Sequence, residues 1–466
     1  MNNQSINFIQ NNMVNNNNMM FNNMNMMNNN NMMNNNMNMM NNNINMMNNN
    51  NMMFNNMNMM NNNNMMNCMN IPQNFLGVIG NNNNQNINAN NNNNNQLNNN
   101  NNAVMHLHKV GLKNLGQTCY MNSSLQCLAN IDIFSKNILN NFQNFNQNNH
   151  PLTLAYACLL YQLKNSNEKY LDPSSFKSIV GNLNPLFEGN NASDAKDLIL
   201  FILQRLHLEL KPPKQNSNDQ IDIYNQEMIS LNKELSYNTF LKDFNSTKTI
   251  VSDTFHGIYE IKLKCNGCKN IKYSYQTFNM LSFILKKVKE DKIKNIGRYY
   301  GGIEILDAFQ SDAKEEILTG ENMIYCNTCQ GTHPGSTQQS IYKLPPVLII
   351  VLNRGKNNQD FNEEFKFHQY LDLSIENYVV VNKSPECNTH FYLQSVITHL
   401  GESGAGGHFI AYCRNGPEED FLCYNDAVVS KATVNDAMGS KVSENVYEKR
   451  TPYILVYHHM KNPETK

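Results

Sequence analysis

Apolar positions recur with the spacing of an α-helix in the first half of the non-repetitive sequence. In two segments the apolar residues lie three or four positions apart, which places them on one helix face. They are Leu152, Ala155, Tyr156, Leu159, Leu160 and Leu163 in the first segment, and Leu198, Ile202, Leu206 and Leu210 in the second. Ser193 stands where the second helix would be capped, and Lys211-Pro212-Pro213 should end it.

From about Val251 onward the apolar runs become shorter and predict strands. Val347–Leu352 is a continuous apolar run after Pro345-Pro346, which is typical of a strand that is buried on both faces. Further predicted strands are Phe391–Leu400, His408–Cys413, Phe421–Asn425 and Tyr453–Tyr457. A helical half followed by a strand-rich half predicts an α+β fold.

Residues 1–105 follow neither pattern. They consist largely of Asn and Met, and pairs of Met recur every six or seven residues from Met19-Met20 to Met65-Met66. A coiled coil could use that spacing, but Asn is a poor helix former and the flanking charges of a coiled coil are absent. We therefore interpret residues 1–105 as a disordered, aggregation-prone, low-complexity tail and residues 106–460 as the folded domain.

Charge and cysteine content narrow the class of protein. The formal net charge is −1 over 466 residues, so we expect no nucleic-acid or membrane partner. We interpret the lysine-rich stretch Lys286–Lys294 as a solvated loop rather than a binding patch. No run of about 20 apolar residues and no signal peptide are visible in the sequence. Four of the 11 cysteines form two C-x-x-C pairs, which favours metal binding over a disulfide framework, and we expect a reducing compartment, the cytoplasm or the nucleus.

Cys119 stands where the turn-rich segment Gly111–Thr118 meets an apolar helical pattern. A thiol at a helix N-terminus faces unpaired backbone N–H groups and the positive end of the helix dipole, which favour the thiolate. The alternative is a buried structural cysteine, and we assign that role to the cysteines within apolar patterns: Cys127, Cys158, Cys413 and Cys423. We predict that Cys119 is a nucleophile.

His408 is the predicted general base. It follows Gly406-Gly407, which would let a substrate backbone approach closely, and it begins a predicted strand. Imidazole can take the thiol proton and later protonate a leaving amine. His399 is the rival, but it ends its own predicted strand, and we interpret it as a structural or supporting histidine.

Three further side chains could complete the site. Asn425 or Asp426 could accept the other imidazole N–H and hold the ring, although an Asn-Asp pair is also an ordinary turn. Asn114, five residues before Cys119, could donate to a developing oxyanion, although by itself it is an ordinary turn residue. A Cys, then a distant His, then a distant Asn or Asp is the order of a papain-like cysteine protease.

Two C-x-x-C pairs predict a metal site. Cys265 and Cys268 form the first, and Cys326 and Cys329 form the second. Each pair can place two thiolates on one tetrahedral ion, so a closed, structural Zn²⁺ site is expected. Four unrelated thiols would not be expected to repeat the same spacing. His333 is a spare ligand candidate.

Taken together, these segments resemble the ubiquitin-specific protease family. Gly111–Gln126 resembles the family's Cys box, and Tyr392–Gly401, Gly406–Tyr412 and Phe421–Asp426 resemble its His box. Leu344–Ile349 and Pro452–Tyr457 resemble two further family strands. The departures are Gln117 for the usual Asn, Phe421 for Trp, Asn353-Arg354-Gly355 for Lys-Arg-Phe, Ser193 for Gln and Leu198 for Phe.

The resemblance implies a papain-like fold with a helical thumb (about 106–250), zinc-tied β fingers (about 251–345) and a β-rich palm (about 346–460). It implies a cysteine-type deubiquitinase that cleaves after the C-terminal Gly of ubiquitin through a thioester, and we expect its catalytic domain to be monomeric. Its triad would be Cys119, His408 and Asn425 with Asp426 beside it, and Asn114 would be the oxyanion donor. Asp194 and Asp197 would hold the basic ubiquitin tail, and Gly406 and Gly407 would line the cleft for it.

Two other functions are compatible with the sequence. A degenerate member of the same fold could bind ubiquitin as a scaffold without cleaving it. The Asn/Met tail could instead make the chain an RNA-binding or assembly-forming protein. Thiol-dependent cleavage of a ubiquitin amide distinguishes the first from an enzyme, and deletion of the tail tests the second.

Overall fold

The structure is a computed structural model that describes residues 108–213, 223–297, 301–355, 358–374, 382, 388–404, 406–439 and 449–460. The tail predicted for residues 1–105 lies outside these ranges. The described residues form two compact units, a smaller one of residues 262–272 and 315–338 and a larger one of the remainder. Within the described residues no helix is long and apolar enough to cross a membrane.

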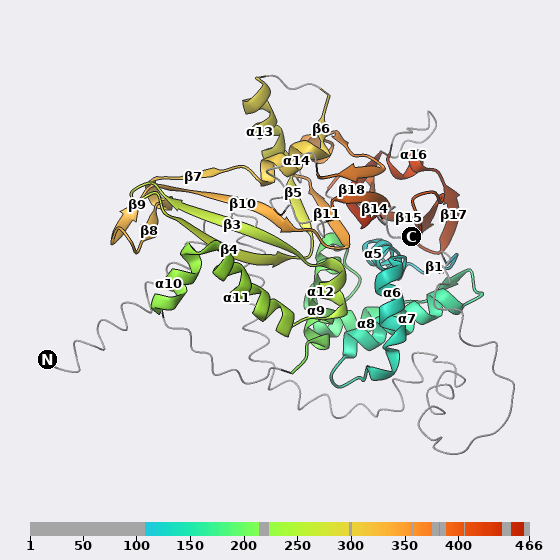
Figure 1. The fold of residues 1–466 in the computed structure, drawn as a ribbon. Helices are drawn as coiled ribbons and strands as arrows, with labels where there is room; N and C mark the ends of the chain where they lie inside the picture. The colour runs from blue at the N-terminus through green and yellow to red at the C-terminus, as the bar shows by residue number, and fades with distance from the viewer. Residues whose placement is uncertain are drawn as a thin grey trace, which may run out of the picture. The chain divides into compact units, whose positions relative to one another are not determined.

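Helices dominate residues 119–255 (Figure 1). They are α5 (Cys119–Ala129), α6 (Asp132–Asn140), α7 (Pro151–Asn165), α8 (Ser174–Leu183), α9 (Ala195–Leu210), α10 (Ile223–Leu231), α11 (Lys233–Ser246) and α12 (Ile250–Phe255). The two helices predicted from periodicity are confirmed as α7 and α9. The predicted cap of α9 is wrong by one residue, because Asp194, not Ser193, accepts the Lys196 backbone N–H at 3.0 Å.

An eight-stranded sheet forms the main β layer of the larger unit. Its order is β17-β16-β15-β14-β18-β11-β5, with β13 also paired to β14. The strands are β5 (Leu281–Ile284), β11 (Val347–Asn353), β13 (Tyr370–Asp372), β14 (His390–Ser403), β15 (Gly406–Cys413), β16 (Phe421–Asn425), β17 (Val428–Ala432) and β18 (Arg450–His459). All the strands predicted from the sequence are present, which confirms the α+β fold, and α5 packs against β14 and β15.

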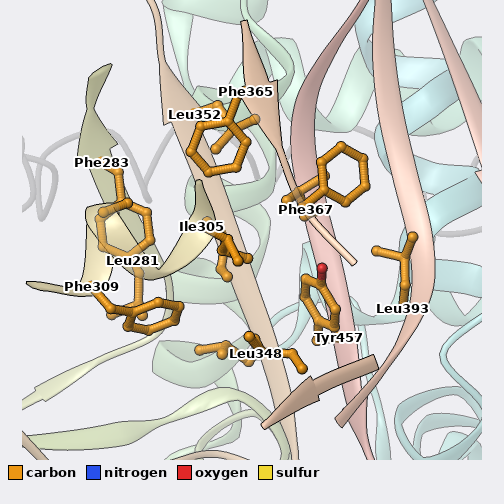
Figure 2. Close-up of a cluster of buried hydrophobic side chains, with 14 of the residues drawn as sticks. Leu281, Phe283, Ile305, Phe309, Leu348, Leu352, Phe365, Phe367, Leu393 and Tyr457 are labelled. Carbon is orange, nitrogen blue, oxygen red and sulfur yellow. The ribbon is translucent and has the colours of Figure 1, made fainter. Parts of the chain in front are cut away.

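The core of the larger unit lies on this sheet (Figure 2). The side chains that point into it include Leu348 and Leu352 of β11, Leu393 of β14 and Tyr457 of β18. All four are fully buried. Burial of a large apolar side chain contributes about 1.5–3 kcal/mol relative to leaving it in water. The central strands β14, β18 and β11 are therefore a rigid base for the residues at the edge of the sheet.

One sequence-based interpretation is corrected here. The lysine-rich stretch Lys286–Lys294 does not form a solvated loop but lies in helix α13 (Leu285–Ile296). Lys289 pairs with Glu363 at 2.6 Å, and Lys292 pairs with Asp307 of α14 (Ile305–Asp312) at 2.7 Å. The helix forms because its apolar residues, among them the buried Leu285 and Val288, reach the core, while Lys286, Lys287 and Lys294 are exposed.

A second sheet has the order β4-β3-β10-β7. Its strands are β4 (Ile271–Phe278), β3 (Gly257–Cys265), β10 (Gly335–Lys343) and β7 (Glu316–Leu318). In the smaller unit, β8 (Ile324–Cys326) and β9 (Gly331–His333) form a hairpin. The larger unit also contains two short strand pairs and two short helices. The strand pairs are β1 (Gly111–Leu112) with β2 (Tyr170–Leu171), and β6 (Ile303–Glu304) with β12 (Phe365–Lys366). The helices are α15 (Asn358–Phe361) and α16 (Val434–Ala437).

Candidate active site and metal centre

A tight loop places Cys119 at the first position of α5. Gly116 and Gln117 adopt left-handed backbone conformations, with φ of 102° and 52°. The Asn114 side-chain oxygen accepts the backbone N–H groups of Gly116 at 2.9 Å and Thr118 at 3.2 Å, which holds the loop closed. Cys119 is therefore at a helix N-terminus, as expected, with 9% of its surface exposed.

A glycine turn brings His408 to the start of β15. Gly407 has a φ of 153°, and a Cβ on it would lie 2.2 Å from Cε1 of His399, so only glycine fits. The His399 ring packs edge-on against Phe361 and Phe409 and is 5% exposed. The interpretation of His399 as a supporting residue agrees with this position, since its ring fills the space beneath Gly407.

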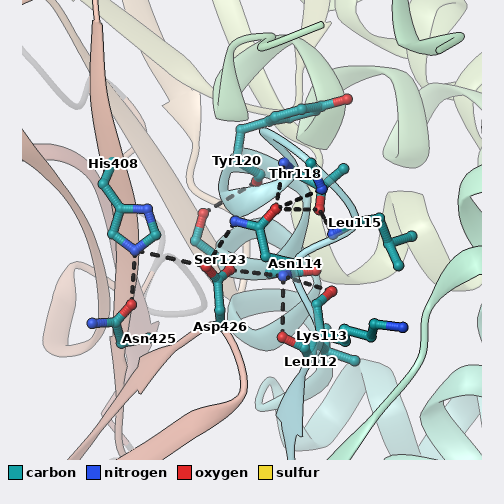
Figure 3. Close-up of polar contacts among 12 residues, drawn as sticks. Leu112, Lys113, Asn114, Leu115, Thr118, Tyr120, Ser123, His408, Asn425 and Asp426 are labelled. Carbon is teal, nitrogen blue, oxygen red and sulfur yellow. Dashed lines mark hydrogen bonds and ion pairs between the residues drawn. The ribbon is translucent and has the colours of Figure 1, made fainter. Parts of the chain in front are cut away.

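The His408 ring faces the amide of Asn425, as Figure 3 shows, and it also interacts with the Cys119 thiol. Its Nε2 lies 2.7 Å from Oδ1 of Asn425, the last residue of β16. The pKa of His408 is raised to about 9, and interaction with Cys119 is the largest cause. Burial lowers the His408 pKa, whereas the bond to Asn425 raises it further. Because Nε2 is engaged by Asn425, Nδ1 is the ring nitrogen left to face the thiol.

Asp426 serves a different set of partners from Asn425. Its Oδ2 is 3.8 Å from Nε2 of His408, beyond hydrogen-bond range, but accepts Nδ2 of Asn114 at 2.9 Å. Its Oδ1 accepts Nδ2 of Asn122 at 2.8 Å, and its backbone oxygen accepts the Leu112 N–H at 2.8 Å. Asn425 is thus the side chain that touches the imidazole, whereas Asp426 links the β16–β17 turn to the loop and helix that carry Cys119.

Asn122 is a site residue that the sequence reasoning missed. It lies three positions after Cys119 on α5, is 2% exposed and also donates to the Leu112 backbone oxygen at 3.2 Å. A buried Asn inside an apolar helix requires hydrogen-bond partners, and this requirement was the available signal. Asn114 donates one of its two amide hydrogens to Asp426, so the other remains for a ligand.

The residues predicted to hold the substrate tail lie at two places. Gly406 and Gly407 are exposed at the start of β15, and a Cβ on Gly406 would meet no atom within 4 Å. Asp194 caps α9, and its Oδ2 accepts bonds from Lys196 Nζ and the Tyr453 hydroxyl, both at 2.6 Å. Asp197 lies in the first turn of α9, where burial and the charge of Asp194 raise its pKa.

Two departures from the family pattern have local explanations. The Gln117 side-chain oxygen accepts the Ala192 N–H at 3.0 Å, so the longer side chain joins the Cys119 loop to the segment before α9. Phe421, in the place of a usual Trp, is 0% exposed, and the guanidinium of Arg414 lies 4.9 Å from its ring. Both side chains therefore have defined partners in this structure.

The four cysteines of the C-x-x-C pairs come together in the smaller unit. Each pair begins at the end of a strand, β3 or β8, and is followed by a residue in the left-handed conformation, Lys269 or Gln330. Their sulfur atoms all lie within 4.8 Å of one another. The Sγ atoms of Cys265 and Cys329 are 3.9 Å apart, and those of Cys268 and Cys326 are 3.6 Å apart.

This cluster fits one tetrahedral ion. Zn–S bonds of about 2.3 Å imply sulfur separations of about 3.8 Å, close to the two distances observed. The surrounding apolar cluster is small: the buried residues are Cys265, Leu318, Ile324 and Cys326. The four cysteines can therefore hold a metal ion, and the small unit has few other contacts to stabilise it.

Comparison with known proteins identifies the family. A family model described as ubiquitin carboxyl-terminal hydrolase matches residues 110–457, three quarters of the chain. The chain belongs to the ubiquitin carboxyl-terminal hydrolase family. The match includes both the Cys119 loop and the strands β14–β18 of the eight-stranded sheet.

Members of the ubiquitin carboxyl-terminal hydrolase family with curated names resemble this chain at modest identity. Ubiquitin carboxyl-terminal hydrolase 5 of Saccharomyces cerevisiae is 28% identical over 358 residues, covering 70% of this chain and 42% of the relative. Usp2 of Drosophila melanogaster is 26% identical, covering 74% of this chain and 34% of the relative. Ubiquitin carboxyl-terminal hydrolase 2 of Homo sapiens is 25% identical, covering 73% and 55%. The chain thus spans only about a third to a half of these relatives.

Proposed function

We propose that this chain is a cysteine-type deubiquitinase that hydrolyses the isopeptide or peptide bond after the C-terminal Gly of ubiquitin. One observation carries the proposal: His408 Nε2 lies 2.7 Å from Asn425 Oδ1, and the Cys119 thiol is near enough to the same ring to be the largest cause of its raised pKa, although Cys119 and His408 come from distant parts of the chain. This arrangement supplies a nucleophile, a base and a group that orients the base. Family membership supports ubiquitin as the substrate.

The proposed reaction has two stages. The Cys119 thiolate attacks the carbonyl carbon of the terminal Gly, and His408 protonates the departing amine, which leaves a thioester on Cys119. His408 then removes a proton from water, the hydroxide attacks the thioester, and the Cys119 thiolate is released with the ubiquitin carboxylate. Asn425 keeps the ring of His408 oriented in both stages. The free N–H of Asn114 and backbone N–H groups at the start of α5 would stabilise the oxyanion.

A trapping experiment tests the proposal directly. Ubiquitin whose C-terminus carries a thiol-reactive group should form one covalent adduct with the protein, and mass spectrometry should place the label on Cys119. The Cys119→Ala variant should form no adduct. A label on another cysteine, or no label with the intact protein, would reject the proposed function and favour a ubiquitin-binding scaffold.

The raised pKa of His408 predicts the alkaline side of the pH profile. Below a pKa of about 9 the imidazole is protonated and can donate to the leaving amine; above it, this proton is lost. We expect kcat/KM for a ubiquitin amide to fall as pH rises through about 9. In Asn425→Ala, which removes a bond that favours the charged ring, this fall should begin at lower pH. A fall at the same pH in both proteins would contradict the role of Asn425.

We propose Zn²⁺ as the ion held by Cys265, Cys268, Cys326 and Cys329, in a structural role. Serine is a poor zinc ligand, so Cys326→Ser should contain less than one Zn²⁺ per chain by elemental analysis. Because zinc binding stabilises the folded state, its melting temperature should fall by about 5–10 °C. Cys423→Ser, which replaces a half-buried thiol outside the cluster, is the matched control and should keep its zinc. Full zinc content in Cys326→Ser would refute the site.

The position of the protein in the cell is part of the proposal. Free, unpaired thiols throughout the described residues favour a reducing compartment, the cytoplasm or the nucleus. The role of the Asn/Met tail remains a separate hypothesis, which deletion of residues 1–105 tests: cleavage of a ubiquitin amide should continue without it.

A further inference from the structure

An internal lysine neutralises the acid that caps α9. Lys196 Nζ lies 2.6 Å from Asp194 Oδ2 and donates to the Tyr453 hydroxyl at 3.2 Å, and its side chain is 24% exposed. Burial disfavours the lysine charge, but Asp194, with smaller effects of Tyr453 and Asp197, raises the Lys196 pKa above its usual value. The ion pair is therefore partly shielded from water and forms in the absence of any substrate.

The acceptor sites of Asp194 are almost fully used. Oδ2 accepts both Lys196 Nζ and the Tyr453 hydroxyl, and Oδ1 accepts the Lys196 backbone N–H at 3.0 Å. A carboxylate offers about four lone pairs in all, so a bidentate arginine would have to displace one of these donors. Binding a bidentate arginine at Asp194 thus requires either Lys196 or Tyr453 to give up its bond to Oδ2.

This ion pair lies close to the residues that carry out the proposed reaction. The Tyr453 ring lies 5.3 Å from the Phe409 ring at a tilt of 56°, and Phe409 directly follows His408 on β15. Asp194 and His408 both influence the pKa of His399, the ring beneath Gly407. A substrate tail that reaches Cys119 past Gly406 and Gly407 therefore passes near Asp194.

Asp197 differs from Asp194 in having no ion-pair partner among the described residues. It lies in the first turn of α9, where burial and the charge of Asp194 raise the pKa of its carboxyl group and the nearby charge of Lys196 lowers it, without an ion-pair contact. A basic side chain placed at Asp197 would offset the repulsion of Asp194. The two acids predicted to hold the tail are thus not equivalent.

We propose that Lys196 is a specificity-determining residue because it occupies Asp194. It thereby weakens selection for one of the two arginines on the ubiquitin tail. Asp197 remains as the acid that receives a basic side chain. The inference rests on the proposed function for the identity of the substrate. A lysine two residues after an acid on the first turn of a helix is, by itself, only a local ion pair. What makes it a specificity device is that it occupies one of the two acids beside the proposed tail path and forms no ion pair with the other.

The test compares Lys196→Met with the parent protein on a series of ubiquitin amides that carry a fluorogenic leaving group. Removing the cation frees Asp194, so KM for unmodified ubiquitin should fall about three- to tenfold, with the change in KM rather than in kcat. Replacing one tail arginine of ubiquitin by Gln should abolish this gain, and replacing the other should not. Lys196→Arg, which keeps the cation, should behave like the parent protein.

A second readout keeps the inference separate from the proposed hydrolysis. In a Cys119→Ala background, the Kd for ubiquitin measured by fluorescence polarisation should fall by the same factor when Lys196→Met is added. If cleavage is absent but binding shows this dependence, the proposed hydrolase fails and the inference stands. If cleavage occurs but KM and Kd do not change, or change equally for every tail variant, the inference is overturned.

Folding defects are controlled by the melting temperature and by a second variant. Tyr453→Phe removes one donor to Asp194 without removing a charge, so it should lower KM in the same direction but less. A rise in KM in both Lys196→Met and Tyr453→Phe, at unchanged melting temperature, would show that the cluster supports substrate binding rather than competing with it, and would overturn the inference.

Discussion

Replacing Cys119 by Ala should abolish cleavage of ubiquitin amides, with a loss of at least about 10⁴-fold in kcat. The thiolate forms the covalent bond of the proposed mechanism, and no other thiol lies beside His408 in the described residues. Binding of ubiquitin should persist, because the substitution removes one side chain from the start of α5 and leaves the surrounding contacts in place. Cleavage is measured by release of a fluorogenic amine, and binding by fluorescence polarisation.

The same variant provides an independent measurement on His408. Its hydrogen bond with Cys119 is the largest cause of its raised pKa, so the imidazole of Cys119→Ala should titrate at a lower pH than in the parent protein. NMR titration of the ring measures this change. Cys158→Ala, which alters a buried cysteine of α7, is the control and should keep both activity and the His408 titration. Residual thiol-dependent turnover in Cys119→Ala would assign the nucleophile elsewhere.

Asn114→Ala should lower kcat by about 10²–10³-fold, the usual cost of losing one oxyanion donor, with little change in KM. Asp426→Asn should lower kcat in the same way but less. Asn114 and Asn122 donate to different oxygens of Asp426, and the substitution turns one of these oxygens into an NH₂ group that cannot accept. If Asp426 acts by holding Asn114, the double variant should be nearly as active as Asn114→Ala alone.

The pH profile distinguishes a role of Asp426 in holding Asn114 from a direct action of Asp426 on the His408 imidazole. Asp426 Oδ2 is 3.8 Å from His408 Nε2, and its charge is the smallest of the causes that raise the His408 pKa. Asp426→Asn should therefore shift the alkaline fall of kcat/KM less than Asn425→Ala does. Asp172→Asn, which alters an exposed acid paired with Lys113, should leave kcat unchanged. Additive losses in the double variant, with a large shift of the pH profile, would assign Asp426 to the imidazole.

Local patterns predicted most of the helices and strands and selected the residues for which a catalytic role is proposed. Helical spacing in α7 and α9 and the apolar run of β11 follow from burial of one face or both, so they are visible without knowledge of the tertiary structure. The turn residues before Cys119 and the glycines before His408 indicated the nucleophile and base, because each chemistry requires a particular backbone setting. The stretch Lys286–Lys294 was misread because its apolar positions are few and only packing against the core shows that they form a helix face.

Long-range contacts explain what remained open. Whether Asn425 or Asp426 orients His408 depends on the direction of two adjacent side chains at a turn, and adjacent residues at a turn have no periodicity to separate them. The role of Asn122 depends on where a distant β16–β17 turn meets α5. The pairing of Lys196 with Asp194 and Tyr453 brings together residues that are 257 positions apart in sequence. Composition and periodicity report local burial; the distances between such groups exist only after the sheet and the helices have packed together.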